Sequence, residues 1–165
     1  MGEYSLELAR SADAPRLAAM SHSLIEDGLR PTWTSSRIGW HVRHPDSVVL
    51  TARVSAISFG TSVIVAFAIM RYGDDIAHLN LLAVDPAHRR RGVGRDLIRW
   101  LEETAETAGT FVIGLELRAS NESALKFYTK LGYRELERIT GYYQGVEPAI
   151  RMSRDVRTAV NPASA

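Results

Sequence analysis

The sequence contains no cysteine among its 165 residues. This absence excludes disulfide bonds, zinc sites built from cysteine and any mechanism that uses a cysteine nucleophile.

Net charge and long apolar runs are also scarce. The formal net charge is only +1, which argues against a protein that binds a nucleic acid backbone through a broad basic surface. The longest apolar run, Val63 to Met70, is too short to cross a bilayer. Residues 1–17 contain early acidic residues and no apolar run, so we expect no signal peptide. These features favour a cytoplasmic protein with neither a nucleic acid nor a membrane as its partner.

The overall composition is that of an ordinary globular protein, with 45% hydrophobic and 24% charged residues. The length fits one domain. We expect a single domain over residues 1–157, acting as a monomer or a homodimer. Residues 158–165 are small and polar without a periodic apolar face, which predicts a flexible C-terminal tail.

Apolar periodicity predicts the element order β-α-α-β-β-β-α-β-α-β-β. Strands are expected over residues 4–8, 47–54, 62–70, 77–84, 110–118, 133–144 and 149–155. Helices are expected to begin near Pro15, after Thr34 or Ser35, at Gly94, and after Ser120 or Asn121. The central strand–helix–strand unit requires a parallel pair, whereas the flanking hairpins are antiparallel. The sequence therefore predicts an α/β (α+β) fold, with a mixed sheet of about seven strands and helices on both faces.

An arginine- and glycine-rich turn lies between a predicted strand and a predicted amphipathic helix. Gly92 and Gly94 would let backbone N–H groups approach an anion closely. The N-terminus of the following helix adds partial positive charge, and the arginines before it add charged donors. This combination suits a pyrophosphate, although a basic turn that only caps the helix has the same composition.

Two nucleotide-binding patterns fail at specific positions of this turn. A P-loop needs Lys followed by Ser or Thr, where this chain has Arg95-Asp96. The dinucleotide fingerprint needs Gly or Ala at the position of Leu97. The remaining match is R-x-x-G-x-G, formed by Arg89, Gly92 and Gly94, and it resembles the coenzyme A pyrophosphate loop of GNAT enzymes.

A second segment, LELRASNESALKFYTKLGYRELERITGYY, resembles the corresponding part of the bacterial ribosomal-protein N-terminal alanine acetyltransferases, the RimI-like GNAT enzymes. The resemblance covers roughly residues 79–152. The first seventy residues resemble the superfamily only in their element order.

The resemblance implies an N-acetyltransferase that uses acetyl-coenzyme A and no metal. Glu116 stands at the position of the proton acceptor, Tyr128 at that of the proton donor, and Asn121 at that of a residue contacting coenzyme A. Leu82, Ala83 and Val84 match the strand whose backbone is expected to pair with the pantetheine arm. The loop expected to hold the pyrophosphate comprises Arg89, Arg90, Arg91, Gly92, Val93, Gly94 and Arg95.

The chemistry of acetyl transfer requires these residue types. A protonated amine cannot attack a thioester, so a carboxylate must remove its proton directly or through water. A phenol is a suitable weak acid for the departing thiolate, and backbone N–H groups near Leu82 to Val84 could polarise the carbonyl. Without cysteine the transfer would be direct, within a ternary complex. Each residue also has a structural alternative: Glu116 could face solvent, and Tyr128 could be a core aromatic.

Other polar and aromatic residues are weaker candidates. His78 and His88 are possible acid–base groups, but neither has a metal-ligand partner at a suitable spacing, and both stay outside the expected mechanism. His88 could equally be a loop residue near the phosphates. Tyr142-Tyr143 matches an aromatic pair of the RimI-like segment and could shape the acceptor pocket or be only a β-rich aromatic stripe.

The acceptor is the main question that the sequence leaves open. A protein or peptide N-terminus is the first hypothesis, and a small amine such as a polyamine, an amino acid or an aminoglycoside is the second. A coenzyme A-binding module without turnover is the third. Residues 24–46 supply acceptor walls in this fold, contain Trp33, Trp40, His41 and His44, and do not resemble the RimI-like enzymes.

Overall fold

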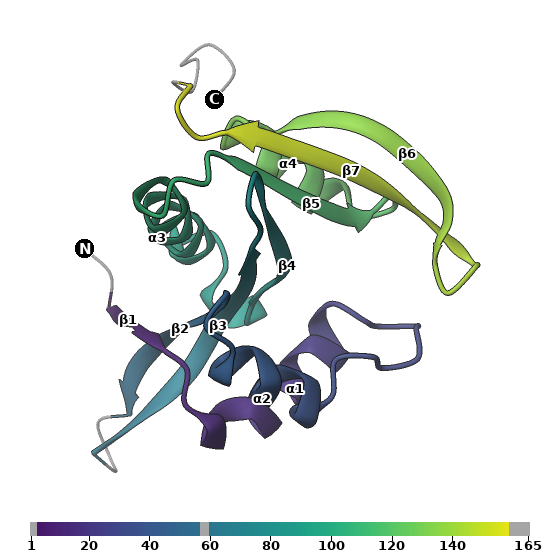
Figure 1. Ribbon diagram of the computed structural model, residues 1–165. Helices are drawn as coiled ribbons and strands as arrows, with labels where there is room; N and C mark the ends of the chain where they lie inside the picture. Colours follow the sequence, from purple (N-terminus) through teal and green to yellow (C-terminus); the bar gives the residue numbers. More distant parts are fainter. Residues whose placement is uncertain (1–2, 57–59, 159–165) are drawn as a thin grey trace. The chain divides into compact units, whose positions relative to one another are not determined.

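The computed structural model of the protein describes residues 3–56 and 60–158. The strands are β1 (Tyr4–Leu8), β2 (Ser47–Ala56), β3 (Thr61–Tyr72), β4 (Ile76–Val84), β5 (Val112–Arg118), β6 (Arg134–Tyr143) and β7 (Glu147–Asp155) (Figure 1). The helices are α1 (Ala14–Leu24), α2 (Ser35–Arg43), α3 (Val93–Thr107) and α4 (Glu122–Lys130), with 3₁₀ turns at Ser11–Asp13 and Pro86–His88. The tail expected over 158–165 lies outside the described residues from 159 onward, as does Phe59 of an expected turn.

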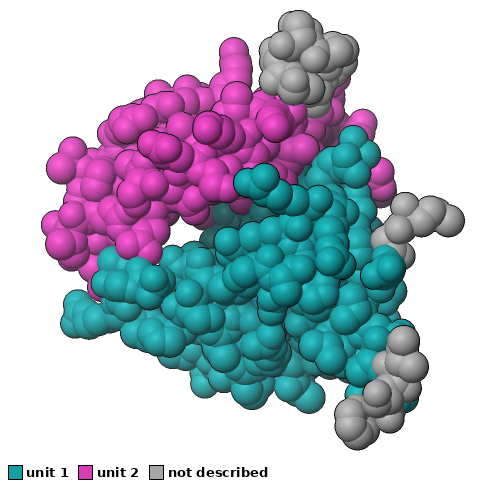
Figure 2. Space-filling model, turned by 180° about the vertical axis from the view of Figure 1, so that it is seen from behind, with its two compact units in different colours: residues 1–71, 79–101 teal, residues 72–78, 102–165 magenta. Residues whose placement is uncertain are grey.

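The expected element order and α/β fold are confirmed, with one mixed sheet in the strand order β1-β2-β3-β4-β5-β7-β6. The chain forms two compact units (Figure 2). Unit 1 comprises residues 1–71 and 79–101, and unit 2 comprises residues 72–78 and 102–165. Strand β4 and helix α3 each contribute residues to both units.

A β-bulge in β3 sets the side-chain pattern of unit 1. The antiparallel β2–β3 register runs from Ala52 opposite Ala66 to Arg53 opposite Ile64, so Val65 is an extra residue. The bulge reverses the alternation of side chains, and Ile64 consequently belongs to the same buried cluster as Phe67 and Ile69.

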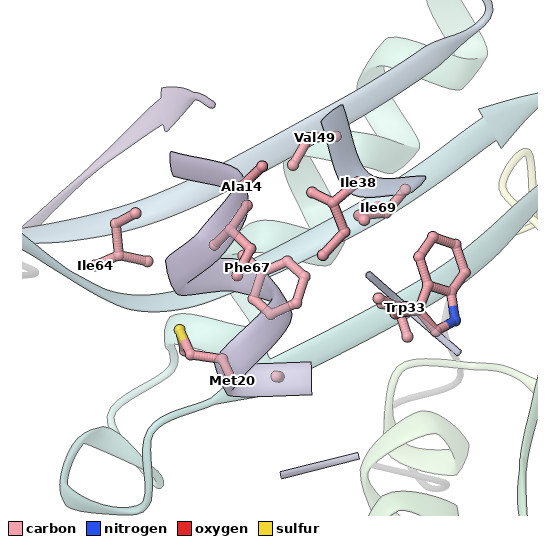
Figure 3. Packing of buried hydrophobic residues seen from close by; sticks show 11 residues of the cluster. Ala14, Met20, Trp33, Ile38, Val49, Ile64, Phe67 and Ile69 are labelled. Atoms are coloured by element: carbon pink, nitrogen blue, oxygen red, sulfur yellow. The ribbon is translucent and has the colours of Figure 1, made fainter. Parts of the chain in front are cut away.

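Helices α1 and α2 contact each other and supply apolar side chains to this cluster. Leu17, Met20 and Ile38 are fully buried with Phe67 (Figure 3). Burial of each such side chain contributes about 1.5–3 kcal/mol, so this helix pair is fixed on the sheet by its apolar face.

The opposite face of β2 and β3 is buried as well. Leu50 and Met70 are buried there, and α3, on this side in Figure 1, carries the fully buried Leu97 and Ile98. The Tyr4 hydroxyl of β1 donates a hydrogen bond to Asp96 of α3. The expectation of helices on both faces is therefore confirmed.

Unit 2 is built on two antiparallel pairings of β7, one with β5 and one with β6. Side chains alternate along β5: Ile113, Leu115 and Leu117 are buried, while Glu116 points to the other side. Helix α3 contains one buried acidic residue, Glu102, which forms an ion pair with Arg154 of β7.

Helix ends follow the local sequence signals. The Thr34 side chain caps α2 by accepting the backbone N–H of Arg37 at 3.2 Å, and Asn121 caps α4 by accepting that of Ala124 at 3.0 Å. Gly109, with a φ of +83°, provides the left-handed residue just beyond α3. Across residues 3–56 and 60–158, every helix is too short or too polar to cross a membrane.

A buried arginine joins the start of α1 to the sheet. Nη2 of Arg53 lies 2.5 Å from Asp13, and its Nε donates to Thr51 at 3.2 Å and lies 3.4 Å from Glu7. Burial alone would raise the pKa of Asp13, but the backbone N–H of Arg10 and the Arg53 guanidinium together lower it. The arginine and Asp13 therefore depend on each other.

We predict that Arg53→Ala destabilises the protein by about 3 kcal/mol, because it leaves a half-buried carboxylate without its counter-ion. Urea denaturation would measure the free energy of unfolding. The matched control is Arg138→Ala, which removes the exposed Arg138–Glu135 pair and should cost less than about 1 kcal/mol. Equal effects of the two substitutions would contradict the structural role of Arg53.

Candidate active site

The arginine- and glycine-rich loop lies in unit 1 between β4 and α3, as expected. The backbone N–H of Asp85 donates to the carbonyl of the bulged Val65 at 2.8 Å, and the Asp85 side chain accepts the N–H of Ala87. Nε of Arg89 donates to the carbonyl of Val84 at 3.1 Å. These bonds tie the start of the loop to the bulge inside β3 and to the end of β4.

The loop backbone contains two left-handed residues immediately before α3. Gly92 has a φ of +81°, and a Cβ added there would lie 3.0 Å from Nη2 of Arg95, so this position suits glycine. Arg90 has a φ of +62°, a strained conformation for a residue with a side chain. Such turns gather backbone N–H groups around anions, and here a helix N-terminus follows directly.

The charges of the loop face outward. Arg89, Arg90, Arg91 and Arg95 are all exposed, whereas Val93 and Gly94 are buried in the first turn of α3. At the end of β4, Ala83 is buried and Leu82 and Val84 are half-buried. The loop therefore presents four guanidinium groups beside a helix N-terminus, an arrangement whose charge suits a polyanion.

Glu116, the expected proton acceptor, lies in unit 2 in the middle part of β5. Its side chain is only 11% exposed. One carboxylate oxygen forms a hydrogen bond with Nε2 of His78 in β4, and the other accepts the Nε–H of Arg151 in β7 at 3.1 Å. The structure thus removes the alternative in which Glu116 is an ordinary solvent-facing residue.

These partners set the charge of Glu116. The hydrogen bond from His78 lowers its pKa most, burial opposes this, and the charges of His78 and Arg151 lower it further. The net effect is a pKa below the usual glutamate value, so Glu116 is ionised at neutral pH. A carboxylate stabilised in this way is a weak proton acceptor by itself.

Arg151 extends the network to the neighbouring strand. Its Nη1 lies 2.5 Å from Glu137 of β6, while its Nε holds Glu116. The network of His78, Glu116, Arg151 and Glu137 therefore draws one side chain from each of four strands.

Tyr128, the expected proton donor, lies on α4 in unit 2 and is buried. Its ring makes edge contacts with Phe127 at 5.0 Å and with Tyr133 at 5.6 Å between centroids. Burial raises the pKa of its phenol well above the usual value, and Tyr143 adds to this effect. Tyr128 therefore keeps its proton across the physiological pH range and can supply it to a stronger base.

The Tyr142-Tyr143 pair at the end of β6 adjoins both candidate residues. The two rings meet edge to face, with centroids 4.9 Å apart. Burial raises the pKa of Tyr142, and the negative charge of Glu116 raises it further. Tyr143 is coupled electrostatically to Glu116 and to Tyr128.

The segment between α1 and α2 is organised by Glu26, which the sequence did not single out. Its buried carboxylate accepts hydrogen bonds from the backbone N–H of Thr32 at 2.5 Å, from that of Trp33 at 3.2 Å and from the Ser21 hydroxyl. Burial would raise the pKa of Glu26, but these backbone and hydroxyl donors lower it. Glu26 thereby shapes the region expected to line the acceptor.

The aromatic residues of that region divide into structural and exposed ones. Trp33 is buried in the core with the Arg37 guanidinium 3.7 Å from its ring centroid. His41 is buried, its Nδ1 lies 2.8 Å from the Ser47 hydroxyl, and burial lowers its pKa to about 4. Trp40 is exposed and stacks on His44 at 4.2 Å.

Two other residues considered in the sequence, Asn121 and His88, are outside the hydrogen-bond network of Glu116. Asn121 is exposed and uses its carbonyl oxygen to cap α4. Nδ1 of His88 is buried and has no hydrogen-bond partner among the described residues. Over residues 3–56 and 60–158, no group of three or more His, Cys, Asp or Glu side chains is arranged to hold a metal ion.

Sequence reasoning missed His78 and Arg151 as partners of Glu116. Alternation along β4 and β7 already placed both opposite the buried residues Ala77, Leu79 and Met152. The pairing itself depends on how strands are aligned with one another, which alternation within a single strand does not reveal.

Comparison with known proteins supports the acetyltransferase resemblance. A bacterial relative from Salmonella typhimurium, the [ribosomal protein bS18]-alanine N-acetyltransferase, is 44% identical over 91 residues, which cover 53% of this chain and 62% of that protein. The chain thus matches less than two thirds of this relative's length.

Two solved structures share the fold. The ribosomal-protein-S18-alanine N-acetyltransferase from Escherichia coli is 26% identical with a TM-score of 0.77, over 96% of this chain and 97% of that one. The NAA60 protein of Arabidopsis thaliana in complex with acetyl-coenzyme A has a TM-score of 0.83 at 17% identity, over 94% of this chain and 99% of that one.

The sequence model of the acetyltransferase (GNAT) family matches residues 17–133, from α1 through α4. This match includes the loop of residues 89–95, Glu116 and Tyr128. The chain belongs to the acetyltransferase (GNAT) family.

Proposed function

We propose that the protein transfers the acetyl group of acetyl-coenzyme A to the free amine at the N-terminus of a protein or peptide. The observation that carries this proposal is that unit 2 holds both a Glu116 carboxylate, 11% exposed and hydrogen-bonded to His78 and Arg151, and a buried Tyr128 phenol. It is supported by the relatives from Salmonella typhimurium and Escherichia coli, whose names describe acetylation of a ribosomal protein alanine. The reaction would take place in the cytoplasm, with residues 1–157 as one catalytic domain that acts as a monomer or a homodimer.

The residues of unit 1 fit the coenzyme. The exposed arginines and left-handed turns of residues 89–95 would hold its pyrophosphate, and the backbone of Leu82, Ala83 and Val84 would bind the pantetheine arm. Asn121 would contact the coenzyme through the side-chain amide that its capping bond leaves available. Acetyl-coenzyme A supplies an acetyl group activated as a thioester, and no metal is required.

The two candidate residues divide the proton transfers. Glu116 drives removal of a proton from the acceptor amine, either itself or through a group bonded to it. Tyr128, which its raised pKa keeps protonated at neutral pH, is the donor of a proton to the sulfur that leaves. The amine attacks the acetyl group directly, since the chain has no cysteine to carry it.

A small-molecule amine is the second candidate acceptor. The observation that favours it is the exposed Trp40, stacked on His44 in the segment where the chain departs from RimI-like sequences. An aromatic face of this kind can bind a cationic or planar small molecule.

The first prediction concerns the acceptor. Thiol release from acetyl-coenzyme A, measured against peptides with varied N-termini and against small amines, should be fastest with a peptide that begins with Ala or Ser. Turnover of small amines alone would contradict a protein N-terminus as the acceptor, but it would remain consistent with Glu116 and Tyr128 as the catalytic residues. Tight coenzyme binding without any turnover would support the non-catalytic alternative.

The second prediction concerns the loop. Arg90→Gly combined with Arg91→Ala should weaken acetyl-coenzyme A binding about tenfold or more, because two charged donors are lost. Glycine is chosen at position 90 because it adopts the φ of +62° without strain. Isothermal calorimetry would measure the affinity, with Arg99→Ala on the exposed side of α3 as the control. An unchanged affinity in the loop variant would show that the anion site is elsewhere.

The third prediction concerns the proton donor. Tyr128→Phe should lower kcat about 10²-fold and leave the acetyl-coenzyme A affinity unchanged, since only the hydroxyl is removed. Tyr133→Phe is the matched control, because its ring packs in the same stack and its hydroxyl has no hydrogen-bond partner among the described residues. Steady-state kinetics would give kcat for both variants. An equal kcat for Tyr128→Phe and Tyr133→Phe would rule out Tyr128 as the proton donor.

A further inference from the structure

The imidazole of His78 is more exposed to solvent than the carboxylate of Glu116 to which it is hydrogen-bonded. The His78 side chain is 42% exposed, whereas that of Glu116 is 11% exposed. Both oxygens of Glu116 are already engaged, one by His78 and the other by Arg151. An amine arriving from solvent would therefore meet His78 more readily than a free oxygen of Glu116.

The hydrogen bond to Glu116 defines the state of this imidazole. A neutral imidazole carries one N–H and one lone pair on its two nitrogens. Because Glu116 is ionised and can only accept, the N–H must be on Nε2, and the lone pair is then on Nδ1. No side chain or backbone group of the described residues forms a hydrogen bond with Nδ1 of His78.

We propose that His78 takes the proton of the acceptor amine through Nδ1 and that Glu116 acts through His78 as a positioning residue. The proposal rests on the acetyl transfer proposed above and names the group bonded to Glu116 that performs the first proton transfer. The carboxylate has two roles: it holds the imidazole in one tautomer and orientation, and it stabilises the imidazolium that forms.

The charges around Glu116 and His78 favour proton transfer to His78. Arg151 of β7 pairs with both Glu116 of β5 and Glu137 of β6, so these three groups together carry one net negative charge. Tyr142 and Tyr143 of β6 are the remaining titratable groups coupled to Glu116, and both are uncharged because burial raises their pKa. A single positive charge on His78 is therefore balanced by its surroundings.

The proton and electron balance of the reaction is complete with groups already named. An N–H bond of the ammonium breaks, its electron pair stays on nitrogen, and the proton passes to Nδ1 of His78 and from there to solvent. The nitrogen then forms a C–N bond with the acetyl carbon, and the C–S bond breaks. The second proton lost by the nitrogen replaces the one that Tyr128 gives to the thiolate, so one proton is released for each acetyl group transferred.

The test is the pH dependence of kcat/KM in His78→Gln, with the acceptor that gives the wild-type protein its best turnover. We expect about a 10²-fold loss of kcat at neutral pH, unchanged acetyl-coenzyme A affinity, and a pH profile of kcat/KM that differs from that of the wild-type protein. His22→Gln, at an exposed histidine of α1, is the matched control and should behave as wild type. A wild-type rate and pH profile in His78→Gln would overturn the proposal.

Two further measurements separate catalysis from a structural effect. Added imidazole should restore part of the activity of His78→Ala, because the site is exposed enough to admit it, and a purely structural histidine would show no rescue. Glu116→Gln combined with His78→Gln should be no slower than the slower single variant, since the two residues act as one unit. Multiplied losses in the double variant would assign them separate roles and overturn the proposal.

The tautomer provides a readout that does not depend on turnover. Nitrogen NMR of the wild-type protein should place the neutral imidazole proton of His78 on Nε2. A proton on Nδ1 would remove the proposed lone pair and overturn the inference. If the wild-type protein acetylates no amine, the proposed function is overturned and the inference with it. If the wild-type protein is active and His78→Gln has the same rate and pH profile, only the inference is overturned.

Discussion

The chemistry of unit 2 depends on the burial of one carboxylate. A buried charge must be matched by opposite charge and hydrogen-bond donors, otherwise it is protonated or the site opens. Glu116 meets this requirement with Arg151 and His78, and these two partners come from strands on different parts of the chain. The alignment of β5 with its neighbours is thus a condition for an ionised Glu116.

The loop of residues 89–95 obeys a different constraint, which lies in its backbone. Left-handed residues at Arg90 and Gly92 and the beginning of α3 form the turn, while the hydrogen bonds of Asp85 and Arg89 attach it to the strands. The arginine side chains add charge to a site whose shape is already determined. This division explains why a glycine pattern identified the loop so readily.

Much of the fold could be predicted because its signals are local. A few consecutive residues determine each of three such features: the apolar face of α3, the helix caps at Thr34 and Asn121, and the alternation of side chains in β5. The loop, Glu116 and Tyr128 were proposed as site residues from motifs of similar length, and their roles stay predictions. The ion pair of Glu102 with Arg154, and the contacts of His78 and Arg151 with Glu116, join distant segments and depend on strand register. Local patterns carry no information about that alignment.

The bulge at Val65 also limits how the chain can change length. A one-residue insertion or deletion elsewhere in β3 would turn the side chains on one side of it to the opposite face, whereas deleting Val65 itself would make the β2–β3 ladder regular and leave Ile64 opposite Arg53. Deleting Val65 would also remove the carbonyl that Asp85 binds at the entrance to the arginine-rich loop. Single-residue insertions and deletions in β3 should therefore be rare among homologous chains, even where individual side chains vary freely.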